Sequence, residues 1–332
     1  MHSQMSKISV ALDWTPNTNH AGFFVANARG LYKAAGIEVD FLSPLDNNYQ
    51  QTPRQRVESG EVHFGIAPSE TVISCHTSDK PRQEGKRLVA VAALLQTQTS
   101  AIVTLKSSGI DSPKQLDGKK YASYEGRFEM PIIQQLIRDD GGEGTAIEVK
   151  PGEHGLGIFN TLLNRPEEYH ATWVFMPWEG VIAKSKGVEL NVFDLEQIPY
   201  GYTPILVGRE DVLDSMLSTV KAFLSATAQG YKLAAQNPEE SAQIVCEVAT
   251  HKGIELSQDI VKESAKELAP AFLTAEGSWG CMEAARWEKF TAWLTVRAAK
   301  CHARTNARAR THTLTLSFSL VSLSVGHRKK AL

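Results

Sequence analysis

The chain has 332 residues, of which 42% are hydrophobic and 22% charged, a balance typical of a soluble globular protein of about two domains. The formal net charge of −2 hides an asymmetry, because residues 301–332 carry six basic side chains and no acid. The residues before them, with 29 basic and 37 acidic side chains, therefore offer no positive field for nucleic acid.

The first hundred residues alternate short apolar runs with helical patterns, as a β-α-β-α-β unit does. Gly36 stands just before an apolar run, where a glycine commonly ends a helix. The unbroken apolar run at 88–95 predicts a strand covered on both faces. The expected strands are 8–12, 37–41, 62–66 and 88–95, and the expected helices are 21–35 and 53–59.

A second unit of the same kind begins with a strand at 101–105. Ser112, Pro113 and Gln115 then supply a capping serine, a proline at the first helical position and a glutamine at the third, which predicts a short helix. The further strands are expected at 119–123, 146–149 and 172–176, and the further helices at 129–139 and 155–163.

Residues 212–300 have apolar side chains at three- and four-residue spacing, which predicts helices. Two βαβ units joined by two extended segments predict an α/β fold with two lobes and a ligand cleft between them. The chain is expected to cross near 96–101 and 200–204, so that lobe 1 comprises 7–100 and 205–298 and lobe 2 comprises 101–204. Residues 301–332 form a basic tail that is expected to be poorly ordered.

Four cysteines, Cys75, Cys246, Cys281 and Cys301, show no CxxC spacing, so neither a disulfide framework nor a zinc site is indicated. No apolar signal core follows Met1, and no apolar run reaches the roughly 20 residues of a membrane span. We therefore expect reduced thiols, no bound metal, no membrane span and a cytoplasmic location.

Residues 12–22, LDWTPNTNHAG, pack polar groups and an aromatic ring into one turn between a strand and a helix. Such a turn at the carboxyl end of a strand faces the ligand crevice of an open α/β sheet. Trp14 can stack on a planar ring there, while Asn17 and Asn19 bind polar edges. His20 can hydrogen-bond a ligand from the same turn. The structural alternative makes Asn19 a helix cap and places Trp14 in the core.

Four runs carry a family resemblance. They are LDWTPNTNHAG at 12–22, GLYKAAGIEV at 30–39, LKSSGIDSPKQLDGKKY at 105–121 and WEG at 178–180. The chain resembles the family that joins bacterial formylaminopyrimidine-binding proteins to the fungal synthase of thiamine's aminopyrimidine phosphate. The resemblance implies a two-lobed periplasmic-binding-protein-like fold of type II, with an aminopyrimidine thiamine precursor as ligand.

The two branches of that family differ in chemistry. The synthases make their product from their own active-site histidine and bound pyridoxal phosphate, and need iron, a lysine and a cysteine cluster. Without gaps, Ala67 falls at the lysine and Thr71 at the histidine, and His76 is the only histidine nearby. Residues 198–204, where the cysteine cluster would lie, hold no thiol. Glu70, Glu179, Tyr200 and Tyr202 resemble the binding branch instead.

The binding chemistry that this implies is physically coherent. A flat aminopyrimidine can lie between Trp14 and one of Tyr200 or Tyr202, where offset stacking contributes roughly 0.5 to 1.5 kcal/mol beyond area burial. Glu179 follows a predicted strand and can accept hydrogen bonds from the exocyclic amine and a protonated ring nitrogen. A solvated surface acid is the alternative role for Glu179.

Residues 124–129 lie between a predicted strand and a helix, where backbone N–H groups converge. Gly126 and Arg127 are therefore possible anion-binding residues. Synthases of the family carry two glycines in this turn for a cofactor phosphate, whereas only Gly126 remains here. Because Glu125 and Glu129 oppose an anion, a purely structural turn is favoured.

Together these features predict a protein that binds a small aminopyrimidine in the supply of the thiamine pyrimidine, with no cofactor and catalytic residues undefined. The first alternative is a divergent pyrimidine phosphate synthase using pyridoxal phosphate, histidine and iron. The second is the substrate-binding component of a transporter for thiamine precursors.

Overall fold

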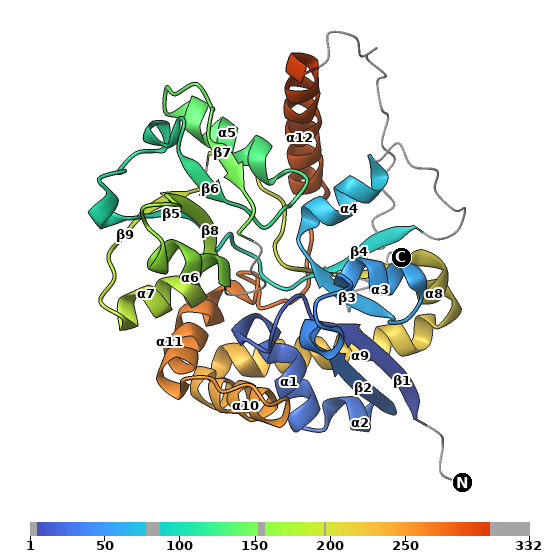
Figure 1. Cartoon of the computed structure of the whole chain (residues 1–332). Helices are drawn as coiled ribbons and strands as arrows, with labels where there is room; N and C mark the ends of the chain where they lie inside the picture. The colour runs from blue at the N-terminus through green and yellow to red at the C-terminus, as the bar shows by residue number, and fades with distance from the viewer. Residues whose placement is uncertain (1–4, 78–86, 152–156, 196, 306–332) are drawn as a thin grey trace. The chain divides into compact units, whose positions relative to one another are not determined.

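The structure, a computed structural model, describes residues 5–77, 87–151, 157–195 and 197–305. These residues divide into two compact units (Figure 1). Unit 1 contains the described residues of 1–97 and 202–282, and unit 2 contains those of 98–201 and 283–305. The divisions at 97/98 and 201/202 fall inside the two predicted crossings. The expected basic tail lies outside the described residues from position 306 onward.

Unit 1 is built on a five-stranded mixed sheet of order β2-β1-β3-β10-β4. β1 is parallel to β2 and β3, while β10 runs antiparallel to β3 and β4. Every residue of β4 is buried, as its unbroken apolar sequence predicts. The strands are β1 (Ser6–Ala11), β2 (Ile37–Leu42), β3 (Phe64–Ala67), β4 (Leu88–Ala93) and β10 (Ile205–Arg209).

The helices of unit 1 begin and end at recognisable signals. Gly30, with φ of +68°, interrupts the helix predicted at 21–35 and divides it into two. Thr52 and Gln55 form a capping box at the start of α3. The helices are α1 (Ala21–Ala28), α2 (Leu31–Ala34), α3 (Pro53–Ser59), α4 (Ser69–His76), α8 (Glu210–Ser215), α9 (Leu217–Gln236), α10 (Pro238–His251) and α11 (Gln258–Leu268).

Aromatic side chains fill the core of unit 1. The ring of Phe223 on α9 stacks on the rings of Phe23, Tyr32 and Phe64, which come from α1, α2 and β3. Gly22 allows the close approach of α9, because a Cβ atom at Gly22 would come within 2.1 Å of the Tyr231 ring. The glycine that ends the LDWTPNTNHAG motif is therefore a packing residue.

Unit 2 contains a second five-stranded sheet of order β7-β6-β8-β5-β9. β6 is parallel to β7 and β8, and β5 is antiparallel to β8 and β9. The strands are β5 (Ser100–Leu105), β6 (Lys120–Ala122), β7 (Ile147–Val149), β8 (Ala171–Phe175) and β9 (Leu190–Asp194). The helices are α5 (Glu129–Asp139), α6 (Gly157–Asn164), α7 (Val181–Ser185) and α12 (Ala284–Thr305).

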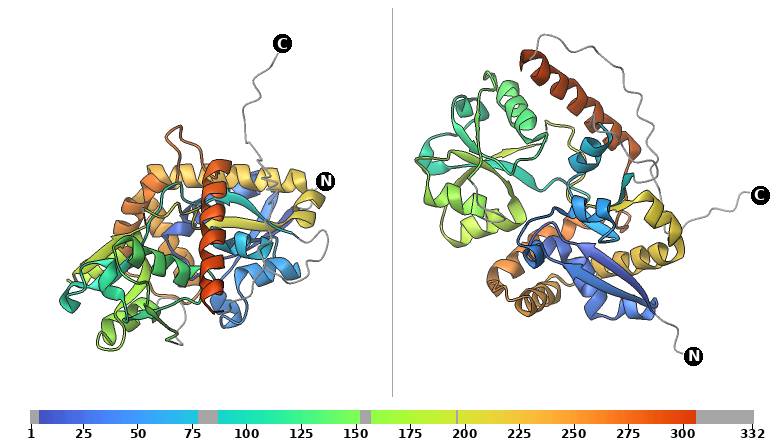
Figure 2. Two further views of the ribbon diagram at one scale, coloured as in Figure 1. Left: turned by 90° about the horizontal axis from the view of Figure 1, so that it is seen from above. Right: turned by 45° about the vertical axis from the view of Figure 1, so that its right-hand side comes forward.

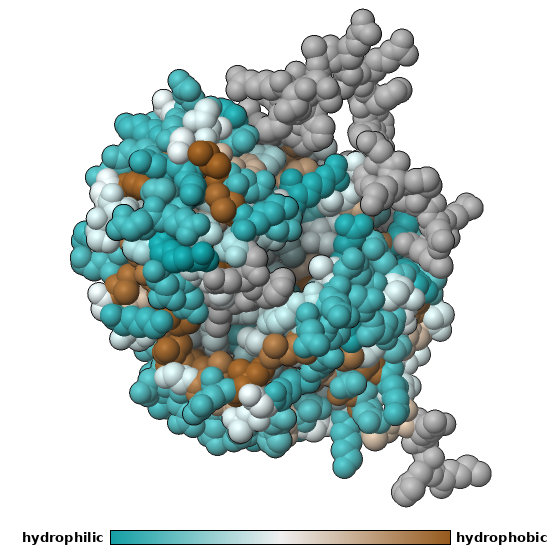
Figure 3. Space-filling view, in the orientation of Figure 1, coloured by the Kyte–Doolittle hydropathy of each residue, from teal (hydrophilic) through white to brown (hydrophobic). Residues whose placement is uncertain are grey.

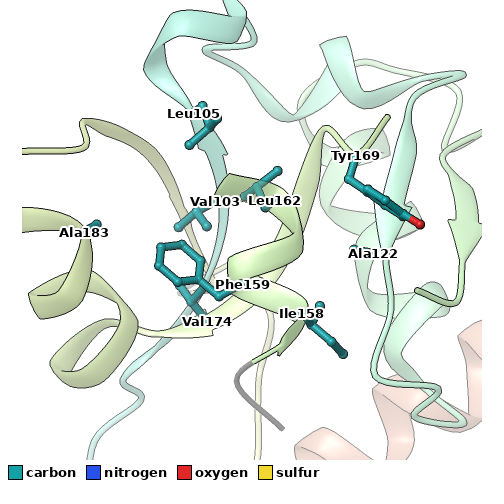
Figure 4. Packing of buried hydrophobic residues seen from close by; sticks show 9 residues of the cluster. All are labelled: Val103, Leu105, Ala122, Ile158, Phe159, Leu162, Tyr169, Val174 and Ala183. Carbon is teal, nitrogen blue, oxygen red and sulfur yellow. The ribbon is translucent and has the colours of Figure 1, made fainter. Parts of the chain in front are cut away.

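One face of this sheet is covered by α6. Ile158, Phe159 and Leu162 of α6 pack with Val103 of β5 and Val174 of β8 in a buried cluster (Figure 4). The apolar side chains of α6 are spaced so that they face the sheet, and alternate side chains of the strands point toward α6. This packing of a helix on a sheet confirms the α/β prediction for unit 2.

Helix α12 clusters with unit 2, whereas the sequence analysis placed residues up to 298 in lobe 1. Figure 2 shows α12 as one straight helix. Arg286 Nε donates to the Tyr200 carbonyl at 3.2 Å, and the rings of Phe290 and Tyr200 lie 4.7 Å apart. The prediction was wrong here because helical periodicity marks an apolar face without identifying the element that covers it.

Within the described ranges, no helix is both long enough and apolar enough to cross a membrane. On the face shown in Figure 3, hydrophilic residues predominate and hydrophobic ones are scattered or form narrow bands. Such scattered apolar residues are normal for a protein surface.

Candidate functional site

The strand order of unit 1 gathers the predicted binding segments at one edge of its sheet. β1, β2 and β3 are parallel, so their carboxyl ends lie at the same edge. β10 is antiparallel, and Ile205 at its start pairs with Ala67 at the end of β3. This edge, called the carboxyl edge of unit 1, therefore holds the segments with Trp14, Glu70 and Tyr202. Ligands of open α/β sheets bind at such edges.

Asn17 and His20 build the turn after β1. Asn17 Oδ1 accepts from the Asn19 backbone N–H at 2.9 Å, and its Nδ2 donates to the Thr15 carbonyl at 2.9 Å. His20 is fully buried, and its Nε2 lies 2.8 Å from Asp13 Oδ1. The helix cap is therefore Asn17, not Asn19 as the structural alternative had it. These bonds fix the turn that carries Trp14.

The remaining predicted residues of unit 1 are placed as follows. Trp14 is half-buried, as is Glu70 in the first turn of α4. The Asn19 side chain is also half-buried, and its carbonyl accepts from Tyr231 Oη at 2.7 Å. Tyr202 is buried, and its carbonyl accepts from the Ser69 N–H at 3.0 Å. Of this set, Trp14, Asn19 and Glu70 retain exposed side-chain surface suitable for a ligand.

Asn47, which follows β2 at the same edge, was not identified from the sequence. Among the described residues, Asn47 Oδ1 and Nδ2 are buried atoms without a hydrogen-bond partner. The next two residues, Asn48 and Tyr49, have φ of +53° and +58°, in the left-handed region that favours glycine. Such strain concentrates at functional sites, and a carboxamide can pair with the donor and acceptor of an aminopyrimidine edge.

The sheet of unit 2 gathers its own segments in the same way. The carboxyl ends of parallel β6, β7 and β8 share one edge, and Ser100 at the start of antiparallel β5 pairs with Phe175 at the end of β8. This carboxyl edge of unit 2 holds residues 98–100, 123–128 and 176–180. Glu179 lies in the last of these segments, as predicted from its position after a strand.

Glu179 is a buried carboxylate. It lies in a π-helical turn, Met176–Gly180, and 1% of its surface is exposed. Its Oε2 accepts from the Phe175 N–H at 2.9 Å. Burial raises the pKa of Glu179 to about 7, although the backbone N–H groups of Phe175 and Glu179 itself oppose this rise. The surface-acid alternative is therefore wrong, and the carboxyl group can hold or give up a proton near neutral pH.

Tyr124 lies at the same carboxyl edge as Glu179, and 41% of the residue is exposed. Its backbone N–H donates to Glu129 Oε1 at 3.1 Å, and its turn follows β6, which pairs with β8, the strand that precedes Glu179. An exposed aromatic ring near a buried carboxylate can stack on a flat heterocycle while the carboxylate binds the amine. The sequence pattern indicates the turn that holds Tyr124 but gives no signal that assigns this tyrosine to the site.

Residues 98–100 add polar groups to the edge of unit 2. Gln98 Oε1 accepts from the N–H groups of Thr99 and Ser100 at 3.0 and 3.1 Å. Within the described part of the chain, Gln98 Nε2, Thr99 Oγ1 and Ser100 Oγ are buried and have no hydrogen-bond partner. Because such groups are costly when unpaired, a polar ligand that satisfies them is stabilised.

Tyr200 is 6% exposed, and its ring lies 4.7 Å from that of Phe290 and 5.7 Å from that of Trp173. Those contacts hold α12 against unit 2. In this structure Tyr200 is therefore a core residue, and its prediction as a stacking partner for the ligand draws no support from its environment.

The possible anion site at Gly126 and Arg127 already has an internal anion. The N–H of Gly126 donates to Glu129 Oε2 at 3.1 Å, and the Arg127 guanidinium lies over the Phe128 ring at 4.9 Å. Burial raises the pKa of Glu129, while hydrogen bonds from Tyr121, Tyr124, Gly126 and Ser123 oppose that rise. The turn is structural, as the opposing carboxylates suggested.

The positions that match the synthase branch hold residues unsuited to pyridoxal phosphate and iron. Ala67 ends β3 and Thr71 lies in α4, so neither supplies an amine or an imidazole. His76 Nε2 bonds to the Leu88 carbonyl at 2.8 Å. No group of three His, Cys, Asp or Glu side chains within the described ranges is arranged to hold a metal. The matching positions do not fit the cofactor.

Comparisons with known proteins were made on sequence and on structure. The family model described as NMT1/THI5 like matches residues 17–241. A formylaminopyrimidine-binding protein of Halalkalibacterium halodurans is 23% identical over 87% of this chain and 85% of its own length. A 4-amino-5-hydroxymethyl-2-methylpyrimidine phosphate synthase of Legionella pneumophila is 24% identical over 84% of this chain and 85% of its own.

Among solved structures, a Candida albicans protein described as having the generic periplasmic binding protein fold is similar to this chain. Its TM-score is 0.60 at 15% identity, and the match covers 95% of this chain and 99% of that protein. The similarity confirms the predicted fold class, which is that of periplasmic-binding-protein-like proteins.

Proposed function

Because the chain belongs to the NMT1/THI5-like family, we propose that it binds an aminopyrimidine precursor of thiamine. The observation that carries this proposal is Glu179, a buried carboxyl group whose pKa is raised to about 7, at the same sheet edge as the partly exposed Tyr124. The formylaminopyrimidine-binding relative supports the ligand class. The biological role that follows is supply of the thiamine pyrimidine by biosynthesis or salvage.

The proposed recognition uses groups that complement each edge of an aminopyrimidine. Glu179 accepts from the exocyclic amine and shares one proton with the adjacent ring nitrogen, a charge-assisted pair about twice as strong as a neutral one. In unit 2, Tyr124 offers an aromatic face and Gln98 a polar atom; in unit 1, Trp14 offers an aromatic face, and Asn47 and Glu70 offer polar atoms. Asn17 and His20 act indirectly, by fixing the turn of Trp14.

The synthase function is the second candidate, and the Legionella pneumophila relative favours it. Against it stand Ala67 and Thr71, which cannot bind a carbonyl cofactor or supply an imidazole. Incubation with pyridoxal phosphate and iron distinguishes the candidates. A synthase would bind the cofactor and lose the mass of a histidine side chain, whereas a binding protein would do neither.

A cytoplasmic location is retained as part of the proposal. Cys75, Cys246 and Cys281 are free thiols in the structure, which is compatible with a reducing compartment.

Replacing Trp14 by alanine is expected to weaken aminopyrimidine binding at least tenfold, about 1.4 kcal/mol, because a stacking face is removed. Trp14→Phe, which keeps an aromatic face, should lose less than half of that free energy. Calorimetric titration of both variants measures the difference. Trp293→Ala is a matched control, since Trp293 is also half-buried but lies on α12. Equal affinities for wild type and Trp14→Ala would remove Trp14 from the site.

A further inference from the structure

The turn of residues 123–128 connects β6 to α5 at the carboxyl edge of unit 2. Glu125 in this turn has φ of +66°, a left-handed conformation that favours glycine. A left-handed residue in such a turn helps successive backbone N–H groups to converge, which makes a concave anion-binding site. The turn therefore has the backbone shape of an anion site.

The carboxylate of Glu129 occupies this anion site. Its Oε1 accepts from Tyr121 Oη at 2.7 Å and from the Tyr124 N–H at 3.1 Å. Its Oε2 accepts from Ser123 Oγ at 3.0 Å and from the Gly126 N–H at 3.1 Å. Each oxygen thus receives two donors, and 8% of the residue is exposed.

We infer that Glu129 acts as a built-in substitute for phosphate, and that this chain therefore selects an unphosphorylated aminopyrimidine over its phosphate ester. A phosphate group at this turn would need the same four donors and would lie against a buried negative charge. Glu125 adds a second carboxylate, which Lys150 Nζ pairs at 3.3 Å. Arg127 is directed over the Phe128 ring.

The location of the turn connects this filled site to ligand choice. β6 and β8 are neighbouring parallel strands, so the turn after β6 and Glu179 after β8 lie side by side at the carboxyl edge of unit 2, and a ring bound at Glu179 has the turn beside it. A phosphate ester on that ring would meet Glu129, whereas a hydroxymethyl or formylamino group carries no charge to repel. The inference that this chain prefers an unphosphorylated ligand rests on the proposed function. The observation that Glu129 fills the turn does not depend on it.

The test is calorimetric titration with three probes: 4-amino-5-hydroxymethyl-2-methylpyrimidine, its monophosphate and inorganic phosphate. Wild type should bind the alcohol at least about a hundredfold more tightly than the ester, and should show no heat with millimolar inorganic phosphate. Glu129→Ala, which vacates the four donors, should bind the ester at least tenfold more tightly than wild type. Affinity for the alcohol should change by less than about threefold.

Glu129→Gln is the second variant, because it keeps a side chain of the same size while removing the negative charge. In this variant, the ratio of the ester's dissociation constant to that of the alcohol should fall at least tenfold. Glu148→Gln is the matched control: Glu148 Oε1 lies 2.9 Å from the same Ser123 Oγ and competes with Glu129 for its single proton, but within the described residues it accepts from no backbone N–H of the turn. The control should leave the preference unchanged. Thermal melts establish which variants fold.

Equal wild-type affinity for alcohol and ester overturns the inference without any variant. An unchanged preference in a folded Glu129 variant also overturns it. If wild type binds neither pyrimidine, the proposed function fails, and inorganic phosphate decides the inference separately. Phosphate binding gained by Glu129→Ala but absent from wild type supports the filled turn, and no gain in the folded variant contradicts it.

Discussion

Replacing Glu179 by glutamine is expected to weaken aminopyrimidine binding about thirtyfold or more, close to 2 kcal/mol. The amide keeps the size of the side chain and can still accept from the Phe175 N–H. It can no longer share a proton with the ring nitrogen, and its NH₂ group faces a ligand amine that is itself a donor. The loss is therefore one of charge and hydrogen-bond polarity rather than of packing.

Calorimetric titration at pH 7 measures this change. Glu189→Gln is the matched control, because Glu189 lies in the same unit on the surface, paired with Lys106 at 3.3 Å. The control should bind like wild type, since exposed pairs contribute little. Equal dissociation constants for Glu179→Gln and wild type would show that this carboxylate does not recognise the ligand.

The same substitution is expected to stabilise the protein without ligand at pH 8. Glu179 has an ordinary pKa of 4.5 and a folded pKa of about 7, so the unfolded state loses its proton first as the pH rises. Wild type therefore loses stability across this window, by roughly 3 kcal/mol at most, and the loss is complete above pH 7. Because glutamine does not titrate, the Glu179→Gln variant does not undergo this loss of stability.

Urea unfolding of wild type and Glu179→Gln between pH 4 and pH 8, followed by tryptophan fluorescence, checks this sign. The advantage of the variant should grow between pH 4.5 and pH 7 and then stay constant. Glu189→Gln again serves as control and should follow wild type. Parallel pH profiles for wild type and Glu179→Gln would contradict a raised pKa at this position.

A binding residue that lowers stability is a common compromise at functional sites. Glu179 illustrates it physically, since burial strengthens its hydrogen bonds to a ligand and also penalises its charge when no ligand is present. A gain in stability together with a loss of affinity would therefore separate Glu179 from an ordinary structural carboxylate.

Local signals predicted much of the fold. Helices 53–59 and 129–139 have the predicted bounds, and the capping box of Thr52 and Gln55 lies at the start of the first. Local signals could not predict which elements pack against each other. The apolar face of α12 was evident, but only the structure shows that Phe290 packs on Tyr200.

The same limit applies to the candidate site: positions at strand ends could be predicted, whereas contacts between side chains could not. Strand-end positions predicted Trp14 and Glu179 because parallel strands present their carboxyl ends together. The role of Asn17 as cap depends on which of two nearby asparagines reaches the free N–H groups. Asn47 and residues 98–100 could not be predicted. Whether a buried polar atom lacks a hydrogen-bond partner depends on its three-dimensional neighbours, which local sequence patterns do not identify.

The filled turn at Glu129 shows how much three-dimensional contact adds. Opposing carboxylates in residues 124–129 indicated only that an external anion was disfavoured. The structure adds the mechanism. The two oxygens of the Glu129 carboxylate accept hydrogen bonds from Tyr121 in β6 and from Ser123, Tyr124 and Gly126 in the turn.

The central claim is that the chain binds an aminopyrimidine through its amine. Titration of wild type with 4-amino-5-hydroxymethyl-2-methylpyrimidine, and with the same ring lacking the 4-amino group, tests it most directly. We predict one ligand per chain with a dissociation constant of about 1 µM or lower, and binding at least tenfold weaker without the amine. No binding of the aminopyrimidine, or equal binding of both rings, would contradict the account.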